Sequence, residues 1–228
     1  VAPLIEEVSG GRVRLRILSN LADRRRAVAR CAIREELMRR PGHDGAAVAE
    51  GVVEAYRFAA VDPYRAATHN KGIMNGIDAV GIATGNDWRG LEAGAHAYAA
   101  RNGRYEPLTR WWRLDGHLHG EIELPMAVGT VGGSTRVHPT LRVLRKLLRV
   151  HDAKELGMVM AAVGLAQNLG ALSALAAEGI QRGHMSLHAR SVALAAGVAE
   201  DRVEDVAAKL VRLNQFSASA ARRIAEGE

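Results

Sequence analysis

Lys71 is the first residue whose setting indicates chemistry. It stands at the start of THNKGIMNGIDAVGIATGND, a segment rich in glycine and alanine that ends with Asp87. A helix is predicted for residues 72–84, so Lys71 stands at its N-terminal end, where the helix dipole disfavours a cation. A carboxylate or the negative charge of a ligand should therefore compensate the lysine. The alternative is an ordinary lysine on a packing helix, with its stem along apolar neighbours.

Asp87 is the nearest candidate for that carboxylate. It follows Lys71 by sixteen residues, which is about 24 Å along an unbroken helix. If the two side chains act at one site, the chain bends around Gly81–Gly85, or the site is built across two subunits.

A third segment, GHMSLHAR, carries His184 and His188 four residues apart, on one face of a helix. This spacing also occurs among metal ligands. The segment lacks the glutamate of the zinc-protease motif, and the chain has no cysteine cluster. We therefore expect no metal and favour His184 as a proton donor, because imidazole titrates near neutral pH.

The elements that must position these residues are mostly helical. A helix is predicted for residues 2–9, a strand for 12–19, and then a helix that Ser19 or Asn20 can cap and that stops at Pro41–Gly42. Further predicted elements are helices at 44–60, 72–84 and 88–101, a hairpin at 109–126 turning at Asp115–Gly116, a glycine loop at 127–135, and helices from Pro139 onward broken at Gly183, Gly197 and near Asn214. The fold class is therefore α+β and mostly helical, with strands in two places.

Small residues indicate close packing within this fold. Glycines recur every four or five residues from Gly72 to Gly94, which lets another backbone approach a helix. The segment 157–180 is long enough to span a bilayer, but Gln167 and Asn168 at its middle favour a buried helix of a soluble protein. The single cysteine, Cys31, agrees with a reducing compartment.

The net charge of +6 raises the possibility of a polyanionic partner. The arginines are scattered, and aromatic residues make up only 4%, so we expect no nucleic acid as partner. LRVLRKLLRV, residues 141–150, could bind nucleic acid or acidic lipid, but its leucines and valines are also explained by core contacts.

Five segments, in this order, resemble the 3-hydroxy-3-methylglutaryl-CoA (HMG-CoA) reductase family in its soluble bacterial class II form. They are RILSNLADRR, YRAATHNKGIMNGIDAV, ATGND, AVGTVGG and GHMSLHAR. The resemblance implies two hydride transfers from NADH or NADPH that interconvert HMG-CoA with mevalonate and CoA. It also implies a cytoplasmic protein and a homodimer or higher homo-oligomer, with no membrane partner.

The resemblance assigns roles to individual residues. Lys71 matches the lysine that stabilises the developing oxyanion, Asp87 the aspartate that pairs with it, and His184 the acid that protonates the CoA thiolate on a C-terminal flap. Substrate contacts are implied for Arg65, Asn75 and Asn20, and cofactor contacts for Val131 and Arg190. From the residues alone, we would favour a helix cap for Asn20, a solvated charge for Arg65 and a packed amide for Asn75.

Three regions follow from the resemblance: the end of a small α/β dinucleotide-binding domain at 1–19, a large substrate- and CoA-binding catalytic domain at 20–180, and the flap at 181–228. The family's catalytic glutamate and its Asp-Ala-Met-Gly motif are not found in this sequence, which begins with Val1. We therefore expect this chain alone to be an incomplete enzyme with little turnover. The alternative is a non-catalytic acyl-CoA-binding or assembly module that retains the fold.

Overall fold

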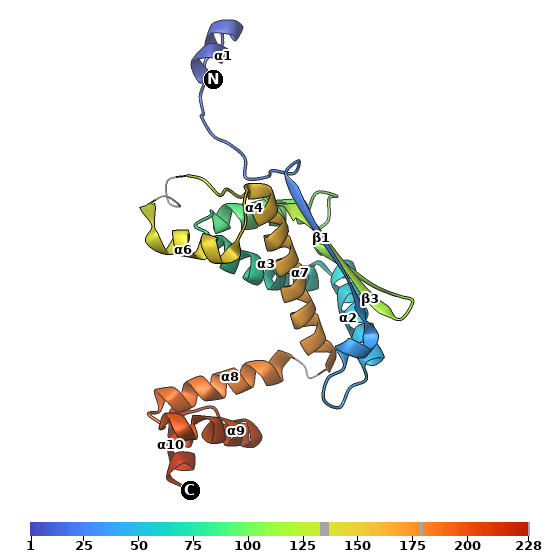
Figure 1. Cartoon of the computed structure of the whole chain (residues 1–228), viewed down its shortest axis with the longest axis vertical. Coiled ribbons are helices and arrows are strands. Elements are labelled where there is room, and N and C mark those ends of the chain that lie inside the picture. Colours follow the sequence, from blue (N-terminus) through green and yellow to red (C-terminus); the bar gives the residue numbers. More distant parts are fainter. Residues whose placement is uncertain (133–136, 178–179, 228) are drawn as a thin grey trace. The chain divides into compact units, whose positions relative to one another are not determined.

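The structure, a computed structural model, describes residues 1–132, 137–177 and 180–227, with the backbone alone described at 180–187. It has one three-stranded sheet of order β1-β3-β2 and is otherwise mainly helical (Figure 1). The elements are α1 (Ala2–Ser9), β1 (Arg26–Arg34), the 3-10 helix η1 (Glu35–Met38), α2 (Gly45–Val61), α3 (Pro63–Ala83), α4 (Trp88–Ala99), β2 (Thr109–Leu114), β3 (His117–Pro125), α6 (Pro139–Leu148), α7 (Ala153–Ala177), α8 (Ile180–Ala195), η2 (Glu200–Arg202), α9 (Val203–Leu213) and α10 (Ala218–Glu226). The predicted α+β class is confirmed.

Contacts divide the chain into two compact units. The first consists of Val1–Cys31, Phe58–Arg110 and Gly120–Asn168, and the second of Ala32–Arg57, Trp111–His119 and Leu169–Glu228. All the candidate site residues described below belong to the first unit, except those on α8. The three regions expected from the resemblance stay a prediction.

The N-terminal part of the chain corrects two predictions. Residues 12–19 form no strand, and Leu15, Ile17 and Leu18 are exposed, because no described segment pairs with them. The helix predicted from Asn20 to Pro41 is also wrong, since Arg26–Arg34 is strand β1. Its side chains alternate between an exposed face and a more buried one, which is the period of a strand. Arg30 on the exposed face binds Glu121 of β3 at 2.6 Å.

The hairpin confirms the predicted turn. Asp115 and Gly116 both have positive φ, 50° and 70°, which a two-residue turn of this kind requires. The turn joins β2 to β3, whose alternate residues Leu118, Ile122 and Leu124 are fully buried. The Asp-Gly pair therefore fixes the register that places these side chains in the core.

Close packing of α3 against α7 confirms the predicted role of Gly76, and Gly164 of α7, which was not predicted, has the same role. A Cβ atom built at Gly76 would lie 2.9 Å from Cβ of Gln167, and one built at Gly164 would lie 2.8 Å from Cδ1 of Ile77. Both distances are too short for a side chain, so the two glycines set how near the helices come. By contrast, Gly72 on α3 has no neighbour within 4 Å.

Helix α7 is long and apolar enough, by length and composition, to cross a membrane, with a mean hydropathy of 1.5 over the relevant window. Only 39% of that window is buried. Leu156, Met160 and Leu165 lie on the buried face, whereas Met158 is about half exposed. The prediction of a buried helix is therefore right for one face of α7.

The C-terminal helices form a cluster with its own core. Residues of α8, α9 and α10 contribute the buried side chains Ala189, Ala193, Val203, Val206, Ala207, Leu210, Ala220, Ala221 and Ile224. The backbone turns after α8 at Gly197 and after α9 at Asn214, both with positive φ, as the sequence predicts. The predicted break at Gly183 is wrong, because α8 continues through it.

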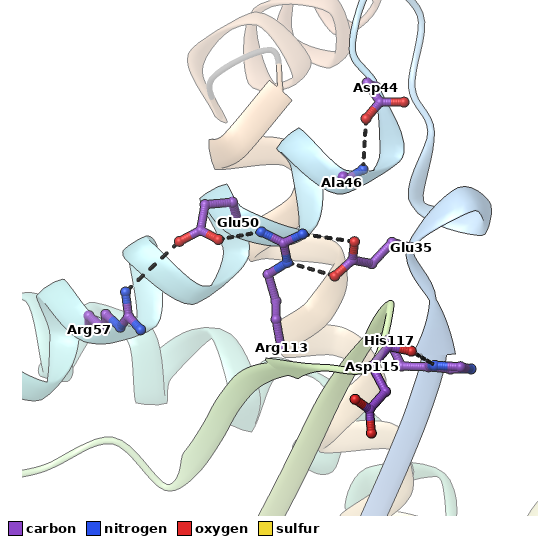
Figure 2. A network of polar contacts seen from close by, with 8 residues as sticks. All are labelled: Glu35, Asp44, Ala46, Glu50, Arg57, Arg113, Asp115 and His117. Atoms are coloured by element: carbon purple, nitrogen blue, oxygen red, sulfur yellow. Dashed lines mark hydrogen bonds and ion pairs between the residues drawn. The ribbon is translucent and has the colours of Figure 1, made fainter.

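An ion-pair network holds the hairpin to the elements around it in the second unit (Figure 2). Arg113 of β2 donates to both carboxylate oxygens of Glu35, at 2.6 and 2.8 Å, and to Glu50 of α2 at 2.5 Å. Hydrogen bonding to Arg113 lowers the pKa of Glu35. One guanidinium thus joins β2, η1 and α2.

Candidate active site

Lys71 lies well inside α3 and not at its start. The helix begins at Pro63, and the side chain of Asp62 caps it by accepting from the N–H of Tyr64 at 2.9 Å. Two turns of helix therefore separate Lys71 from the N-terminal end, and the expected clash with the dipole does not arise. The sequence places proline at the first helical position, a common helix-start signal that accounts for the difference.

The lysine is exposed, and it makes no ion pair or side-chain hydrogen bond with any residue that the structure describes. Asn75, one turn further, is exposed on the same face, so the structure brings these two residues together. Arg65 lies on a different face, because six residues turn a helix by about 600°, which leaves the two side chains about 120° apart around the axis. It is half-buried, and burial lowers its pKa.

Asp87 caps the N-terminus of α4. Its Oδ1 accepts from the N–H of Gly90 at 3.0 Å, and its side chain is exposed. Helix α3 continues from Lys71 to Ala83, a rise of about 18 Å, before the turn that leads to Asp87. No ion pair joins Lys71 and Asp87 within the described part of the chain. Within the described residues the two side chains are therefore not paired, and their joint action at one site stays a prediction.

Asn20 lies beside Asp87, although the two are far apart in sequence. A Cβ atom built at Gly90 would lie 2.7 Å from Oδ2 of Asp87 and 3.2 Å from Oδ1 of Asn20. At Gly94 it would lie 2.7 Å from the backbone oxygen of Asn20. The missing side chains at these two positions let Asn20 approach α4. Its predicted role as a helix cap is wrong, since no helix follows it.

The glycine loop reaches the same end of α4. The N–H of Gly129 donates to Oδ1 of Asn86 at 2.8 Å, next to Asp87 in the chain. Val131, two residues further along the loop, is largely exposed. Asn20, Asp87 and the loop thus converge at the start of α4, in the first unit. We call this group the α4 cluster.

The α8 residues belong to the second unit. The side chain of His184 lies outside the part of the chain that the structure describes. Arg190, exposed on α8, forms an ion pair with Glu204 of α9, with 3.0 Å between Nε and Oε1. No group of three or more metal-ligating side chains occurs among the described residues.

A buried polar chain next to Lys71 escaped the sequence analysis. His69 Nε2 and Thr109 Oγ1 are 2.7 Å apart, and Thr109 donates to Oδ1 of Asn168 at 2.9 Å. Because the single hydroxyl proton of Thr109 goes to Asn168, Nε2 of His69 is the donor in the other bond. Burial, with a smaller contribution from Arg65, lowers the pKa of His69 to about 3. Two signals in the sequence could have predicted this chain of hydrogen bonds. One is the polar residues just before Lys71 in THNK, and the other is Asn168 inside an apolar helix.

A cavity of about 440 Å³ was also not predicted. It is lined by Leu21, Asp23, Arg24, Arg26, Tyr98 and Arg101. Arg101 stacks over the Tyr98 ring, with 3.8 Å between its guanidinium carbon and the ring centroid. Leu21, which lines the cavity, directly follows Asn20, so the cavity lies close to the α4 cluster. The lining arginines give it positive charge.

Comparison with known proteins decides the family. The family model described as Hydroxymethylglutaryl-coenzyme A reductase matches residues 1–189. The chain belongs to this family. A curated relative from Archaeoglobus fulgidus, 3-hydroxy-3-methylglutaryl-coenzyme A reductase, is 52% identical over 228 residues, covering 99% of this chain and 51% of that protein. A probable 3-hydroxy-3-methylglutaryl-coenzyme A reductase from Borreliella burgdorferi is 46% identical over 128 residues, covering 56% of this chain and 30% of that protein.

Solved structures agree. The HMG-CoA reductase of Streptococcus pneumoniae has a TM-score of 0.72 at 45% identity, covering 99% of this chain and 54% of that one. A second structure, described as the class II enzyme of that organism bound to NADPH in open conformations, has the same TM-score at 46% identity and is covered to 55%. The chain thus spans about half the length of these reductases. The resemblance seen in the sequence is confirmed.

Proposed function

We propose that the protein carrying this chain is an NAD(P)H-dependent HMG-CoA reductase that interconverts HMG-CoA with mevalonate and CoA. The observation that carries this proposal is 52% identity to a curated reductase across 99% of the chain, together with Lys71, Asp87 and His184 in the segments that resemble the family. The relative bound to NADPH supports a nicotinamide cofactor.

In the proposed chemistry, the ammonium of Lys71 stabilises the oxygen that becomes negative as hydride reaches the thioester carbonyl. Asp87 keeps that ammonium charged, and His184 protonates the leaving CoA thiolate. The nicotinamide cofactor supplies the hydride when it is bound. Arg65, Asn75 and Asn20 would bind the substrate, while Val131 and Arg190 would contact the cofactor side.

The positions of Lys71 and Asp87 support a site shared between two copies of the chain. Lys71 is exposed without a described acidic partner, and Asp87 stands at the far end of α3. A second copy could bring an Asp87 to each Lys71, which is how symmetric dimers build sites from two surfaces. We therefore propose at least a homodimer, and a cytoplasmic one, as the likeness to soluble bacterial reductases suggests.

The test uses the protein expressed from its complete open reading frame. NADPH oxidation with HMG-CoA is measured for the unaltered protein and for Lys71→Ala, with Lys154→Ala, another exposed lysine, as control. We expect Lys71→Ala to lower kcat at least about a hundredfold and the control to leave it unchanged. Unchanged turnover in Lys71→Ala would overturn the assignment. Binding of CoA and HMG-CoA without any turnover of the unaltered protein would instead indicate a non-catalytic acyl-CoA-binding module.

Mixing two inactive variants tests the shared site. If Lys71 and Asp87 come from different copies, co-expressed Lys71→Ala and Asp87→Ala chains form mixed dimers in which one of the two sites is intact. With random pairing, about a quarter of the normal activity returns. If both residues act within one copy, the mixture stays inactive.

A further inference from the structure

The C-terminal half of α6 borders an open cavity of about 620 Å³ in the first unit. We call it the α6 cavity. Its lining residues are Arg142, Arg145, Lys146, Arg149, Val150 and His151. Small-molecule sites commonly have volumes of a few hundred to about a thousand Å³, so the space suits a ligand of nucleotide size.

The four cations of the α6 cavity are close together without neutralising partners. Each lies three or four residues from another along α6 and its C-cap, a spacing at which like charges repel. None of them makes an ion pair with a described residue. His151, in contrast, has the carboxylate of Glu155 at 2.9 Å from its Nδ1.

The helix dipole does not account for so many cations. Arg145 and Lys146 occupy the last turn of α6, where the dipole favours positive charge. That end carries about half an elementary negative charge, far less than the four positive charges that line the cavity. Most of the positive charge of the α6 cavity is therefore available to attract an anion from outside the chain.

Arg145 gives a second, independent indication. Its Nε atom is buried and has no hydrogen-bond partner among the described residues. Burying an N–H of a charged group without a partner costs free energy. A ligand oxygen that accepted this hydrogen bond would remove the cost. Guanidinium groups present paired donors that match phosphate oxygens.

We propose that the α6 cavity binds the diphosphate group of a soluble, nucleotide-sized anion. Arg145 contacts the phosphate oxygens from the wall of the cavity, and Arg142, Lys146 and Arg149 surround the remaining charge. The site is separate from the α4 cluster, and the proposal does not rest on the reductase function. Its test is a binding measurement that requires no turnover.

Isothermal titration calorimetry of the purified protein with inorganic pyrophosphate, and then with ADP, tests the proposal. Both should bind, ADP should compete with pyrophosphate, and affinity should fall as NaCl is raised. The triple variant Arg142→Gln/Lys146→Gln/Arg149→Gln should bind pyrophosphate at least about tenfold more weakly. Arg145→Lys keeps the charge but loses the paired donors, and it should also weaken binding.

The matched control removes the same number of positive charges elsewhere. Arg12→Gln/Arg14→Gln/Arg16→Gln alters three exposed arginines of the N-terminal segment and should bind pyrophosphate as the unaltered protein does. Equal weakening in both triple variants, or no binding by the unaltered protein at 1 mM pyrophosphate (about the weakest affinity of interest), would overturn the proposal. Sedimentation with phosphatidylglycerol vesicles that depends on the same residues, without pyrophosphate binding, would overturn it in favour of a lipid surface.

Discussion

Asn86 accepts a hydrogen bond from the backbone N–H of Gly129 at 2.8 Å, across forty-three positions of sequence. The same side chain donates through Nδ2 to the hydroxyl of Thr84 at 2.9 Å. One amide therefore joins the end of α3 to the glycine loop, immediately before the residue that caps α4. The position of the loop at the α4 cluster depends on this bond.

Asn86→Ala should release the glycine loop. It removes the acceptor of the Gly129 N–H, and we expect a loss of about 1–2 kcal/mol in the free energy of unfolding, measured by urea denaturation. The Gly129 amide should also exchange with solvent faster in NMR hydrogen exchange. The control is Asn102→Ala, which removes an exposed bond to Glu106 and should change stability much less. Unchanged exchange at Gly129 in Asn86→Ala would contradict the anchoring role.

Adding a methyl group to α7 should destabilise the protein where it meets α3. Gly164→Ala would place Cβ within 3.2 Å of Ile77 and Ile73, and such overpacking costs roughly 1–3 kcal/mol. Gly72→Ala is the matched change at an open helical position, where alanine should stabilise by about 0.5–1 kcal/mol. The two variants should therefore shift the melting temperature in opposite directions. A shift of the same sign in both would show that packing does not decide the outcome.

Asp78 makes the stability depend on pH in an unusual direction. Burial, and then the nearby Glu92, raises the pKa of Asp78 from its ordinary value of 3.8 to about 7. The folded chain thus binds this proton more tightly than the unfolded chain does. The contribution of Asp78 to stability is fully present below about pH 4 and is lost as the pH rises to about 7.

Asp78→Asn should remove this dependence. We expect the variant to be more stable than the unaltered protein at pH 8, by roughly 1–2 kcal/mol after solvent screening is considered, and the difference to vanish near pH 4. Urea titrations at both pH values measure it. Asp201→Asn, at an exposed aspartate, should show no such pattern. A variant less stable than the unaltered protein at pH 8 would contradict the expected sign.

Arg113 should contribute to stability in the opposite pH range. Its hydrogen bonds lower the pKa of Glu35, so the contribution is present above about pH 4.5 and is lost as the pH falls through the lowered pKa. Arg113→Met should cost about 1 kcal/mol at pH 7 and clearly less at pH 3. Arg110→Met, on the same strand and exposed, is the control. Equal losses at both pH values would mean that the ion pairs in Figure 2 are not the cause.

Local signals in the sequence were sufficient for several elements. The Asp115–Gly116 pair predicted the hairpin because its backbone preference is nearly independent of the rest of the chain. Strand β1 was missed because its partner β3 lies about ninety residues away, while Asn20 and Asp23 resembled the start of a helix. The start of α3 was missed because Asp62–Pro63 was interpreted as the end of the preceding helix.

The candidate site was predictable by residue type but not by geometry. The family segments named Asn20, Asp87 and the glycine loop, and the structure brings these three together. Asn20 approaches Asp87 through contacts at Gly90 and Gly94. The four-residue spacing of these glycines was visible in the sequence, but their contact with Asn20 was not. The pairing of Lys71 with Asp87 could not be predicted, because most of helix α3 separates the two residues within one chain. The pair would need the proposed second copy.

The buried ring of His69 has a consequence for kinetic work on the complete protein. With a pKa of about 3, this imidazole stays neutral throughout the range in which enzymes are usually assayed. Any inflection in a pH–rate profile between pH 5 and 9 must therefore originate from other groups. Although it lies two residues from Lys71, His69 can be omitted from the interpretation of such a curve.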